Sequence, residues 1–431
     1  MQTQLQQAVY LHQEAFLEDL KEIMQVASVK SEPAPNAPFG LKLKEALEVV
    51  KAMAIRLGFE FTVVNDAVGY IQLGTGDDYI GVISHLDVVP EGELDQWDYP
   101  PFDLTEKEGR LYGRGVLDNK GPLISCLYGL YLIKESGLPI QKPLRLMFGT
   151  DEESGSSDIP MYLAKEKPPV FAFTPDCKYP VVYGEMGYLN LSVTTEITDG
   201  SCEWVQDLKI DAHASKIPDK LTYRRKDEAE VTHIQGKSAP TNAPDMADNV
   251  ILKLLKQVED KGQGQLQTIF AKMASKLDPK GSGTAFGFQE PIQIVPYDLK
   301  IGAGKVTTAL VIRYGIELTQ EQVLAQLQTV DNHWGELTIN RAMPSVVMDK
   351  TRDEIKIMSH IYETLTGLDG TPVTTTGATY ARHMPNTVAF GPSMPGQRAI
   401  AHLPNEWMDV ADLMKNFEIY TLTMYELVKW R

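Results

Sequence analysis

The sequence predicts an α/β protein, in which a doubly wound, mostly parallel-sheet domain is interrupted by an inserted α+β domain with a mainly antiparallel sheet. Two observations favour this fold class. Short apolar runs alternate with helical segments in both terminal parts of the chain, as in doubly wound sheets. Between about Tyr188 and Arg341 the strands instead alternate with period two, which is typical of antiparallel strands. We therefore expect one domain at residues 1–186 and 343–431, and the inserted domain at 187–342.

The first domain begins with two helices and a pair of strands. Amphipathic patterns predict helices over about 5–26 and 41–57, and the second of them ends at Gly58. Strands are expected at 59–64 and 69–73, because the intervening Asn65-Asp66 is a hairpin-like signal.

The stretch from Tyr79 to Pro122 organises the rest of the chain. Its unbroken apolar run at 79–83 is typical of a buried parallel strand, and His85 follows this run. Asp118 precedes a segment at 121–131 that is apolar on nearly every face, which predicts a buried helix. Ligand crevices of open α/β sheets lie at the carboxyl edge of the strands, so His85 and Asp118 mark a candidate site.

Two further strands, at 144–148 and 170–173, are each followed by carboxylates. Asp151-Glu152-Glu153 comes after the first, and Asp176 comes after the second. His402 lies near the end of the chain, after a last predicted strand at 387–390. The remaining predicted helices lie at about 246–259, 265–275, 319–330 and 351–366.

Composition limits the classes of partner. A chain of 431 residues is long enough for two domains, and a net charge of −17 argues against nucleic acid, which needs clustered Lys and Arg. Three widely spaced cysteines imply no disulfide framework and fit a reducing cytoplasm. The N-terminus does not resemble a signal peptide, and no apolar stretch is long enough to span a bilayer. We expect a cytoplasmic protein that binds neither nucleic acid nor membrane.

Two histidines and three carboxylates form a candidate metal centre, namely His85, Asp118, Glu153, Asp176 and His402. A pair of divalent ions that share one bridging carboxylate, each also held by one His and one further carboxylate, needs this set of ligands. Imidazole and carboxylate suit zinc, and also cobalt or manganese. Two ions about 3.5–4 Å apart would acidify a water held between them and clamp the attacking and carbonyl oxygens.

Two more residues complete the candidate site. Glu152, adjacent to Glu153, can act as the base that takes a proton from water and later gives it to a leaving amine. Asp87, two residues after His85, can accept the other imidazole N–H and fix its tautomer.

Each of these residues also has a purely structural interpretation. A His at a strand end is commonly a hydrogen bonder, and Asp118 could cap the following helix. Asp151-Glu152-Glu153 could be a solvated charge run, and Pro175-Asp176 could be a turn. Their joint occurrence at the ends of predicted strands favours the metal centre.

Several motifs resemble those of the co-catalytic di-zinc metallopeptidases, a superfamily that includes aminoacylase, carboxypeptidase G and dipeptidase V. They lie at 85–90, 115–122, 149–155, 174–176 and 401–406. The likeness is greatest to dipeptidase V, through Thr379-Tyr380-Ala381-Arg382 with Met384-Pro385-Asn386, and through Val311-Ile312-Arg313-Tyr314. Together the resemblance extends over nearly the whole chain.

This resemblance implies a role for each residue of the site. His85 and Asp176 would hold one zinc, Glu153 and His402 the other, and Asp118 would bridge them, with Glu152 as the base and Asp87 behind His85. The fork of Arg313 would bind the substrate's terminal carboxylate. Ser215 and Gly377 are further substrate-binding candidates, and the substrate would be a small peptide.

The resemblance also implies that the insert at 187–342 is a lid. In dimeric members the lid is shorter and makes the dimer, whereas in dipeptidase V it is enlarged and imitates the partner's lid within a monomer. This insert is nearer the enlarged kind, so a monomer is favoured over a homodimer.

Two lid positions depart from the family pattern. Pro240 stands where a His should steady the oxyanion, and Ser215 stands where the family has Asn. Alternatively, His213 or His233 takes the role of that His. The predicted function is metal-dependent hydrolysis of dipeptides or short peptides with a free C-terminal carboxylate. The alternatives are an N-acyl amino acid amidohydrolase, or a metal-bound protein with weak or no catalysis because of Pro240.

Overall fold

A computed structural model describes residues 2–330 and 335–429, and the chain packs as two compact units. The first comprises Met1–Tyr183, Met348–Thr374 and Ala378–Arg431, and the second comprises Gly184–Val347 and Thr375–Gly377. The expected boundaries at 186/187 and 342/343 differ from these by a few residues, and the sequence did not indicate that 375–377 joins the second unit. Residues 331–334 of the expected insert lie outside the described residues.

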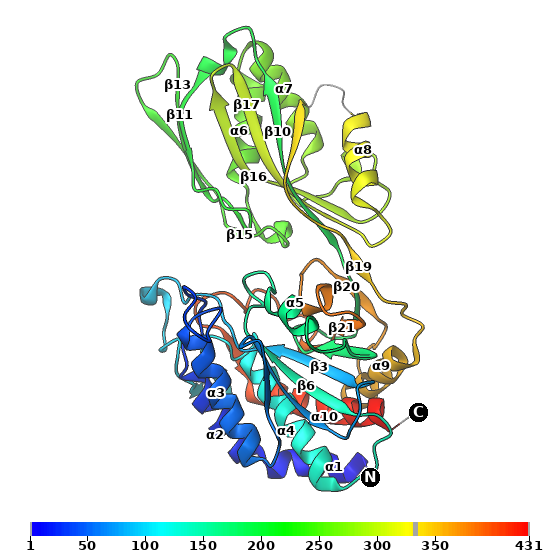
Figure 1. Cartoon of the computed structure of the whole chain (residues 1–431). Helices are drawn as coiled ribbons and strands as arrows, with labels where there is room; N and C mark the ends of the chain where they lie inside the picture. The colour runs from blue at the N-terminus through cyan, green and yellow to red at the C-terminus, as the bar shows by residue number, and fades with distance from the viewer. Residues whose placement is uncertain (1, 331–334, 430–431) are drawn as a thin grey trace. The chain divides into compact units, whose positions relative to one another are not determined.

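The first unit contains a large mixed sheet with helices on both faces (Figure 1). Its elements are α1 (Gln2–Leu11), α2 (Gln13–Met24), α3 (Leu41–Arg56), β1 (Thr62–Val64), β2 (Val68–Leu73), β3 (Ile80–His85), β4 (Thr105–Lys107), β5 (Arg110–Tyr112), α4 (Lys120–Ser136), β6 (Leu144–Gly149), α5 (Asp158–Leu163), β7 (Phe171–Thr174), β8 (Cys177–Lys178), α9 (Asp353–Thr366), β21 (Thr387–Ala389), β22 (Pro392–Ser393), β23 (Trp407–Asp409) and α10 (Val410–Val428). β9 (Val182–Glu185) and β20 (Val373–Thr375) cross between the units.

The strand order of this sheet is β1-β2-β6-β3-β7-β21-β9-β19, where β19 is Val346–Val347 and β20 pairs with β9. The central strands β6, β3, β7 and β21 run parallel, whereas the pairs toward both edges are antiparallel. Alternate residues of β3 enter two different cores, since Ile80 and Val82 pack in one buried cluster and Ile83 in the other. A sheet buried on both faces is what the continuous apolar runs predicted, so the fold class is confirmed.

Two features of the first unit differ from expectation. The helix expected at 5–26 is broken into α1 and α2 at His12, whose φ of −101° and ψ of 8° leave the helical region. The C-terminal helix α10 is not among the predicted elements. It is buried nearly all round and carries buried Asn416, Glu418 and Thr421, so its sequence lacks the single apolar stripe of a surface helix.

The second unit is built on an antiparallel sheet, as expected. Its elements are β10 (Gly187–Glu196), β11 (Val205–Ile210), β12 (Lys216–Ile217), β13 (Lys220–Arg225), β14 (Val231–Gln235), β15 (Ala239–Pro240), α6 (Val250–Lys261), α7 (Gly264–Lys276), β16 (Ile292–Gly302), β17 (Lys305–Tyr314), α8 (Gln320–Val330), β18 (Glu336–Met343) and β19 (Val346–Val347). The main sheet has the order β16-β17-β10-β18. Leu254 of α6 and Phe270 of α7 share one core with Leu189, Leu191 and Leu310 of this sheet. The strand residues that alternate with these leucines therefore lie on the opposite face of the sheet.

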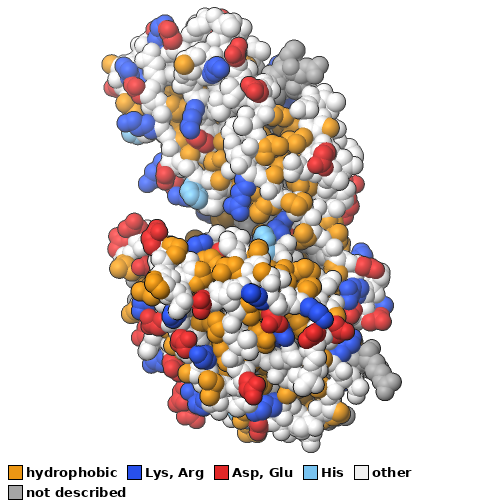
Figure 2. Space-filling view, viewed as in Figure 1, with side chains coloured by type: hydrophobic (Ala, Val, Ile, Leu, Met, Phe, Trp, Pro, Cys, Tyr) orange, Lys and Arg blue, Asp and Glu red, His pale blue; other side chains and the backbone are white. Residues whose placement is uncertain are grey.

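Two further features are the distribution of surface charge and the character of the helices. On the face seen in Figure 2, basic and acidic side chains are interspersed, and the basic ones do not gather into one patch. Among the described residues, no helix combines the length and the apolar character that crossing a bilayer requires.

The packing of α4 against α10 allows a stability prediction. A Cβ at Gly129 of α4 would lie 2.6 Å from Met424 Cε and 2.9 Å from Thr421 Oγ1, both on α10. Gly129→Val should therefore lower the free energy of unfolding by about 1–3 kcal/mol, as overpacking of a core typically does. Urea unfolding measures this, with Glu135→Val at an exposed position of α4 as the control. Equal stabilities of the two variants would contradict the close helix contact.

Candidate metal centre

The parallel strands bring most of the predicted ligands to one edge of the sheet. His85 is the last residue of β3, and Asp118 lies in the loop that enters α4. Glu153 follows β6 and Asp176 follows β7, and both strands lie next to β3. His402 comes from the segment between β22 and β23. Because the carboxyl ends of neighbouring parallel strands meet at the same edge, residues distant in sequence become neighbours here.

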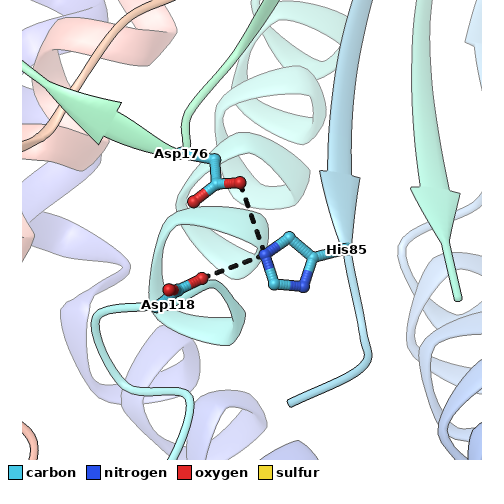
Figure 3. Close-up of side chains that lie close together, drawn as sticks. All are labelled: His85, Asp118 and Asp176. Atoms are coloured by element: carbon cyan, nitrogen blue, oxygen red, sulfur yellow. Dashed lines mark hydrogen bonds and ion pairs between the residues drawn. The ribbon is translucent and has the colours of Figure 1, made fainter. Parts of the chain in front are cut away.

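His85 forms the first ligand group with Asp118 and Asp176 (Figure 3). Its Nε2 lies 3.0 Å from Asp118 Oδ1 and 3.5 Å from Asp176 Oδ2. Its Nδ1 lies 2.8 Å from the backbone carbonyl oxygen of Asp87. A carbonyl only accepts, so Nδ1 carries a proton and Nε2 faces two carboxylates. A lone pair on Nε2 would repel both carboxylates, unless a proton or a metal ion lies between the nitrogen and the carboxylate oxygens.

His402 forms the second group with Asp118 and Glu153. Its Nε2 lies 2.9 Å from Asp118 Oδ2 and 3.0 Å from Glu153 Oε1. Asp118 thus belongs to both groups, with Oδ1 toward His85 and Oδ2 toward His402. Within each group the ligand atoms lie within 4.8 Å of one another. Both groups consist of imidazole and carboxylate, so they fit two divalent ions that share Asp118.

Burial and the neighbouring charges shift the pKa values of the acids in the two groups. Burial, and next the charge of Asp118, raise the pKa of Glu153 to about 7. Burial and the charge of Asp176 hold the pKa of Glu152 well above its usual range. Asp118 is the opposite case: burial would raise its pKa, but hydrogen bonds from His402 and His85 outweigh this and lower it. Without cations, protons must compensate the negative charge, whereas bound divalent ions would let all these carboxylates ionise.

Asp87 orients the loop that carries Glu152 and Glu153. Its carboxylate oxygens accept the backbone N–H groups of Glu152 and Glu153, at 3.1 and 2.9 Å. Asp87 Oδ1 lies 3.4 Å from His85 Nδ1, farther than the backbone carbonyl of the same residue. The acceptor that lies nearest to the imidazole N–H is therefore the backbone of Asp87, whereas the sequence led us to expect its carboxylate.

Glu406 is a site residue whose role the sequence did not reveal. Its Oε1 accepts the backbone N–H groups of Gly115, Leu117 and Asp118 at 3.0–3.1 Å. Its Oε2 lies 2.7 Å from Nη1 of the buried Arg114. One carboxylate therefore ties the loop of Asp118 to the segment of His402. The only signal for this role in the sequence was the position of Glu406, four residues after His402 and within the motif at 401–406.

Asn119 and Asp158 hold the other loops. The Asn119 amide donates to the backbone oxygen of Pro175 at 2.6 Å and its Oδ1 accepts from the Ser84 hydroxyl, so it joins β3 to the loop of Asp176. Asp158 accepts the backbone N–H groups of Thr150 and Asp151. These roles depend on which backbone groups lie beside Asn119 and Asp158 in the folded chain. The spacing of residues along the sequence does not reveal them.

In the second unit, Arg313 of β17 is a partly buried cation whose hydrogen-bond partners are neutral. Its Nε donates to the backbone oxygen of Thr376 at 3.2 Å and its Nη1 to Thr241 Oγ1 at 3.3 Å, and its guanidinium lies 5.4 Å from the Tyr188 ring centre. Burial lowers the pKa of Arg313 to about 10. Among the described residues no carboxylate forms an ion pair with it, so an anionic ligand would be its natural partner.

The structure also places the remaining lid candidates. Ser215 Oγ lies 2.8 Å from His213 Nδ1, and the backbone oxygen of Ser215 accepts from Thr241 N at 3.0 Å. Pro240 lies on β15 opposite Lys216 of β12, whereas His233 lies on β14 in a separate sheet. Gly377 belongs to the second unit, and its N–H donates to Thr375 Oγ1 at 3.1 Å.

Fold and site together define a class of protein. An open α/β sheet that gathers carboxylates and imidazoles at its carboxyl edge has the equipment of a metal-dependent hydrolase. The chain belongs to the peptidase family M20/M25/M40, whose family model matches residues 81–426. It is thus a member of a metallopeptidase family, and the resemblance drawn from its motifs is confirmed.

Known proteins align with nearly the whole chain. The putative dipeptidase YtjP of Bacillus subtilis (strain 168) is 26% identical, over 96% of this chain and 98% of its own. The Beta-Ala-Xaa dipeptidase of Lactobacillus delbrueckii subsp. lactis is 28% identical, over 96% of each chain. The solved structure of the di-peptidase Dug1p from Saccharomyces cerevisiae superimposes with a TM-score of 0.62 at 17% identity, covering 100% of this chain and 99% of that one. This last similarity shows a common fold.

Glu406 provides the prediction for the metal centre. Glu406→Gln removes the charge that faces Arg114 and disturbs the loop of Asp118, so metal affinity should fall about 10–100-fold, as for other residues that orient ligands. Calorimetric titration with zinc measures the affinity. Leu403→Ala, at an exposed side chain of the same segment, should bind zinc normally. An unchanged affinity in a folded Glu406→Gln variant would show that Glu406 does not position Asp118.

Proposed function

We propose that this protein is a dipeptidase that uses two divalent metal ions to hydrolyse dipeptides or short peptides with a free C-terminal carboxylate. Zinc is the metal we expect, and cobalt or manganese suit the same ligands. The observation that carries the proposal is the division of Asp118 between two groups, its Oδ1 near His85 and its Oδ2 near His402. The dipeptidases among the relatives support this class of substrate.

Within this proposal Glu152 acts as the general base. When bound, the two metal ions supply Lewis acidity that polarises the peptide carbonyl and activates water. The Glu152 carboxylate takes the proton from the attacking water and passes it to the leaving amine. Glu152 is suited to this role, because it is next to the candidate ligand Glu153 but belongs to neither ligand group.

Arg313 binds the C-terminal carboxylate of the substrate in this proposal. It is partly buried, it donates to neutral groups of Thr376 and Thr241, and its planar fork matches a carboxylate. Ser215 and Gly377 are proposed as further substrate contacts, since the Ser215 backbone binds Thr241, which in turn binds Arg313.

The lid has two candidate arrangements for the oxyanion. Pro240 has neither a side-chain donor nor a backbone N–H, so it cannot stabilise negative charge. His213 lies close by, because its partner Ser215 is hydrogen-bonded to Thr241, the residue after Pro240. His233 is less suited, since it lies on a different sheet from β15.

A second candidate function is hydrolysis of N-acyl amino acids, because these also have a free carboxylate for Arg313 and an amide for the metal centre. A protein with weak or no catalysis is the third candidate, and Pro240 favours it.

The zinc-loaded protein should be assayed against panels of dipeptides and of N-acetyl amino acids. We expect turnover of dipeptides, and turnover limited to the acyl panel would overturn the dipeptidase proposal. We still expect this protein to be a monomer in the cytoplasm and to bind no nucleic acid.

Glu152→Gln tests the general base. The variant should keep both metal ions by elemental analysis but lose activity by about 10²-fold or more, the usual scale for general acid–base catalysis. Glu153→Gln is the matched control, because it alters a ligand of the second group and should lower metal content as well as activity. Undiminished turnover by Glu152→Gln would exclude Glu152 from proton transfer.

Arg313→Ala tests carboxylate recognition. Loss of a charged, desolvated partner should weaken dipeptide binding by about 2–4 kcal/mol, measured as KM and as inhibition by products. Arg313→Lys keeps the charge without the fork and should be intermediate. Dipeptide amides should be poor substrates of the normal enzyme and lose little more in Arg313→Ala. If acid and amide are turned over equally by the normal enzyme, Arg313 does not read the carboxylate.

Pro240→His and His213→Ala decide between the two lid arrangements. One missing oxyanion donor typically costs about 10²–10³ in kcat. If the donor is absent, Pro240→His should raise the rate of dipeptide hydrolysis, and His213→Ala and His233→Ala should have little effect. A collapse of activity in His213→Ala with metal content preserved would instead assign the role to His213.

A further inference from the structure

Thr241 is a buried polar residue of the second unit, and the proposed chemistry gives it no role of its own. It directly follows Pro240 of β15, and it is fully buried. Its backbone N–H donates to the backbone oxygen of Ser215 at 3.0 Å, next to the pairing of β15 with β12. Its side chain joins the turn at 213–216 to Arg313 of β17.

The Thr241 hydroxyl has two partners whose chemistry determines its orientation. The backbone oxygen of Ala214 lies 3.0 Å away and can only accept, so the hydroxyl donates its proton to this oxygen. Arg313 Nη1 lies 3.3 Å away and can only donate, so it faces a lone pair of the same hydroxyl. The bond to the turn at 213–216 therefore orients the acceptor that Arg313 meets.

The turn at 213–216 has internal contacts that make it a firm support for Thr241. The backbone N–H of Lys216 donates to the backbone oxygen of His213 at 3.0 Å and closes the turn. Inside the turn, His213 Nδ1 accepts from the Ser215 hydroxyl at 2.8 Å and from the Ser215 N–H at 3.3 Å. The position of the Thr241 hydroxyl is thus set by hydrogen-bonded backbone on both sides.

Arg313 gains from such a support, because a long arginine side chain loses much conformational freedom when a ligand immobilises it. Among the described residues, its guanidinium donates to Thr241 Oγ1 and to the backbone oxygen of Thr376, and all three residues belong to the second unit. These contacts order the side chain in advance. The N–H groups that they do not use remain for a ligand.

We propose that Thr241 is a positioning residue that fixes the guanidinium of Arg313 before the substrate binds, so that it meets the substrate's C-terminal carboxylate in one orientation. The inference rests on the proposed function, in which Arg313 binds that carboxylate. Thr241 acts only through Arg313, because it is itself fully buried. Loss of its hydroxyl should therefore weaken carboxylate recognition and leave the metal centre unchanged, since all candidate ligands belong to the first unit.

Thr241→Val tests the proposal, because valine keeps the shape of threonine and removes the hydroxyl. The substrates are Ala-Leu and Ala-Leu amide, or the best dipeptide of the panel and its amide, with the zinc-loaded full chain. KM for the dipeptide should rise about tenfold, the scale for a lost hydrogen bond to a charged group, with kcat within about threefold and zinc content preserved. Hydrolysis of the amide, which has no carboxylate, should change by less than about threefold.

Two further variants separate positioning from general stability. Thr241→Ser restores the hydroxyl and should return KM for the dipeptide to within about threefold of the normal value. Thr308→Val makes the same change at another buried threonine of β17, whose hydroxyl faces Met273 of α7. This control should leave the kinetics of both substrates unchanged.

A double variant shows whether Thr241 acts through Arg313. In the Arg313→Ala background, Thr241→Val should change KM for the dipeptide by less than about threefold, because effects within one network do not add. A further tenfold rise in that background, an equal loss on dipeptide and amide, or a normal KM in folded Thr241→Val would each overturn the proposal. If the normal enzyme hydrolyses no dipeptide, or hydrolyses dipeptide and amide equally, the proposed function fails first and this proposal falls with it.

Discussion

The burial and mutual repulsion of carboxylates around two imidazoles is the constraint on which the metal centre of this structure depends. Asp118, Glu153 and Asp176 converge on His85 and His402 at the carboxyl edge of one sheet. Burial, and next the charge of a neighbouring carboxylate, raise the pKa values of Glu152, Glu153 and Asp176, so it is unfavourable to ionise them all together. Compensating cations would stabilise such a cluster, and the two ligand groups that share Asp118 fit the two ions of the proposed function.

Around the ligands, buried side chains keep the ligand loops in place against this repulsion, because they form hydrogen bonds to the backbone of those loops. Glu406 captures the N–H groups around Asp118, and Asp87 captures those of Glu152 and Glu153. Asn119 fixes the loop of Asp176 to β3, and Asp158 fixes the loop after β6. These contacts join segments hundreds of residues apart, such as Gly115 and Glu406. Ligand positions are thus set by a network around them as much as by the strands that end there.

The sequence predicted most of the fold and the identity of the ligands, for a clear physical reason. Strands buried on both faces leave continuous apolar runs, and the polar residues that follow them must lie at the sheet edge. His85, Glu153 and Asp176 could be located this way. His402 stands several residues beyond the predicted strand at 387–390, so its inclusion depended on how well it completed the set of ligands.

Other features could not be predicted, because they depend on contacts that leave no local pattern. α10 is buried nearly all round and so lacks a periodic stripe. Glu406 looks like an ordinary acidic residue, yet it accepts three backbone N–H groups. The pairing of Gln293 of β16 with Arg313 of β17 arises from strand register, which spacing along the chain does not determine.

The central claim, that Asp118 bridges two metal ions, is tested most directly by diffraction. Crystals of the zinc-loaded protein should be measured on both sides of the zinc absorption edge. The account predicts two anomalous peaks about 3.5–4 Å apart, one bound by His85 and Asp176, the other by Glu153 and His402, with one oxygen of Asp118 on each. A single peak, or two peaks that do not share Asp118, would contradict it.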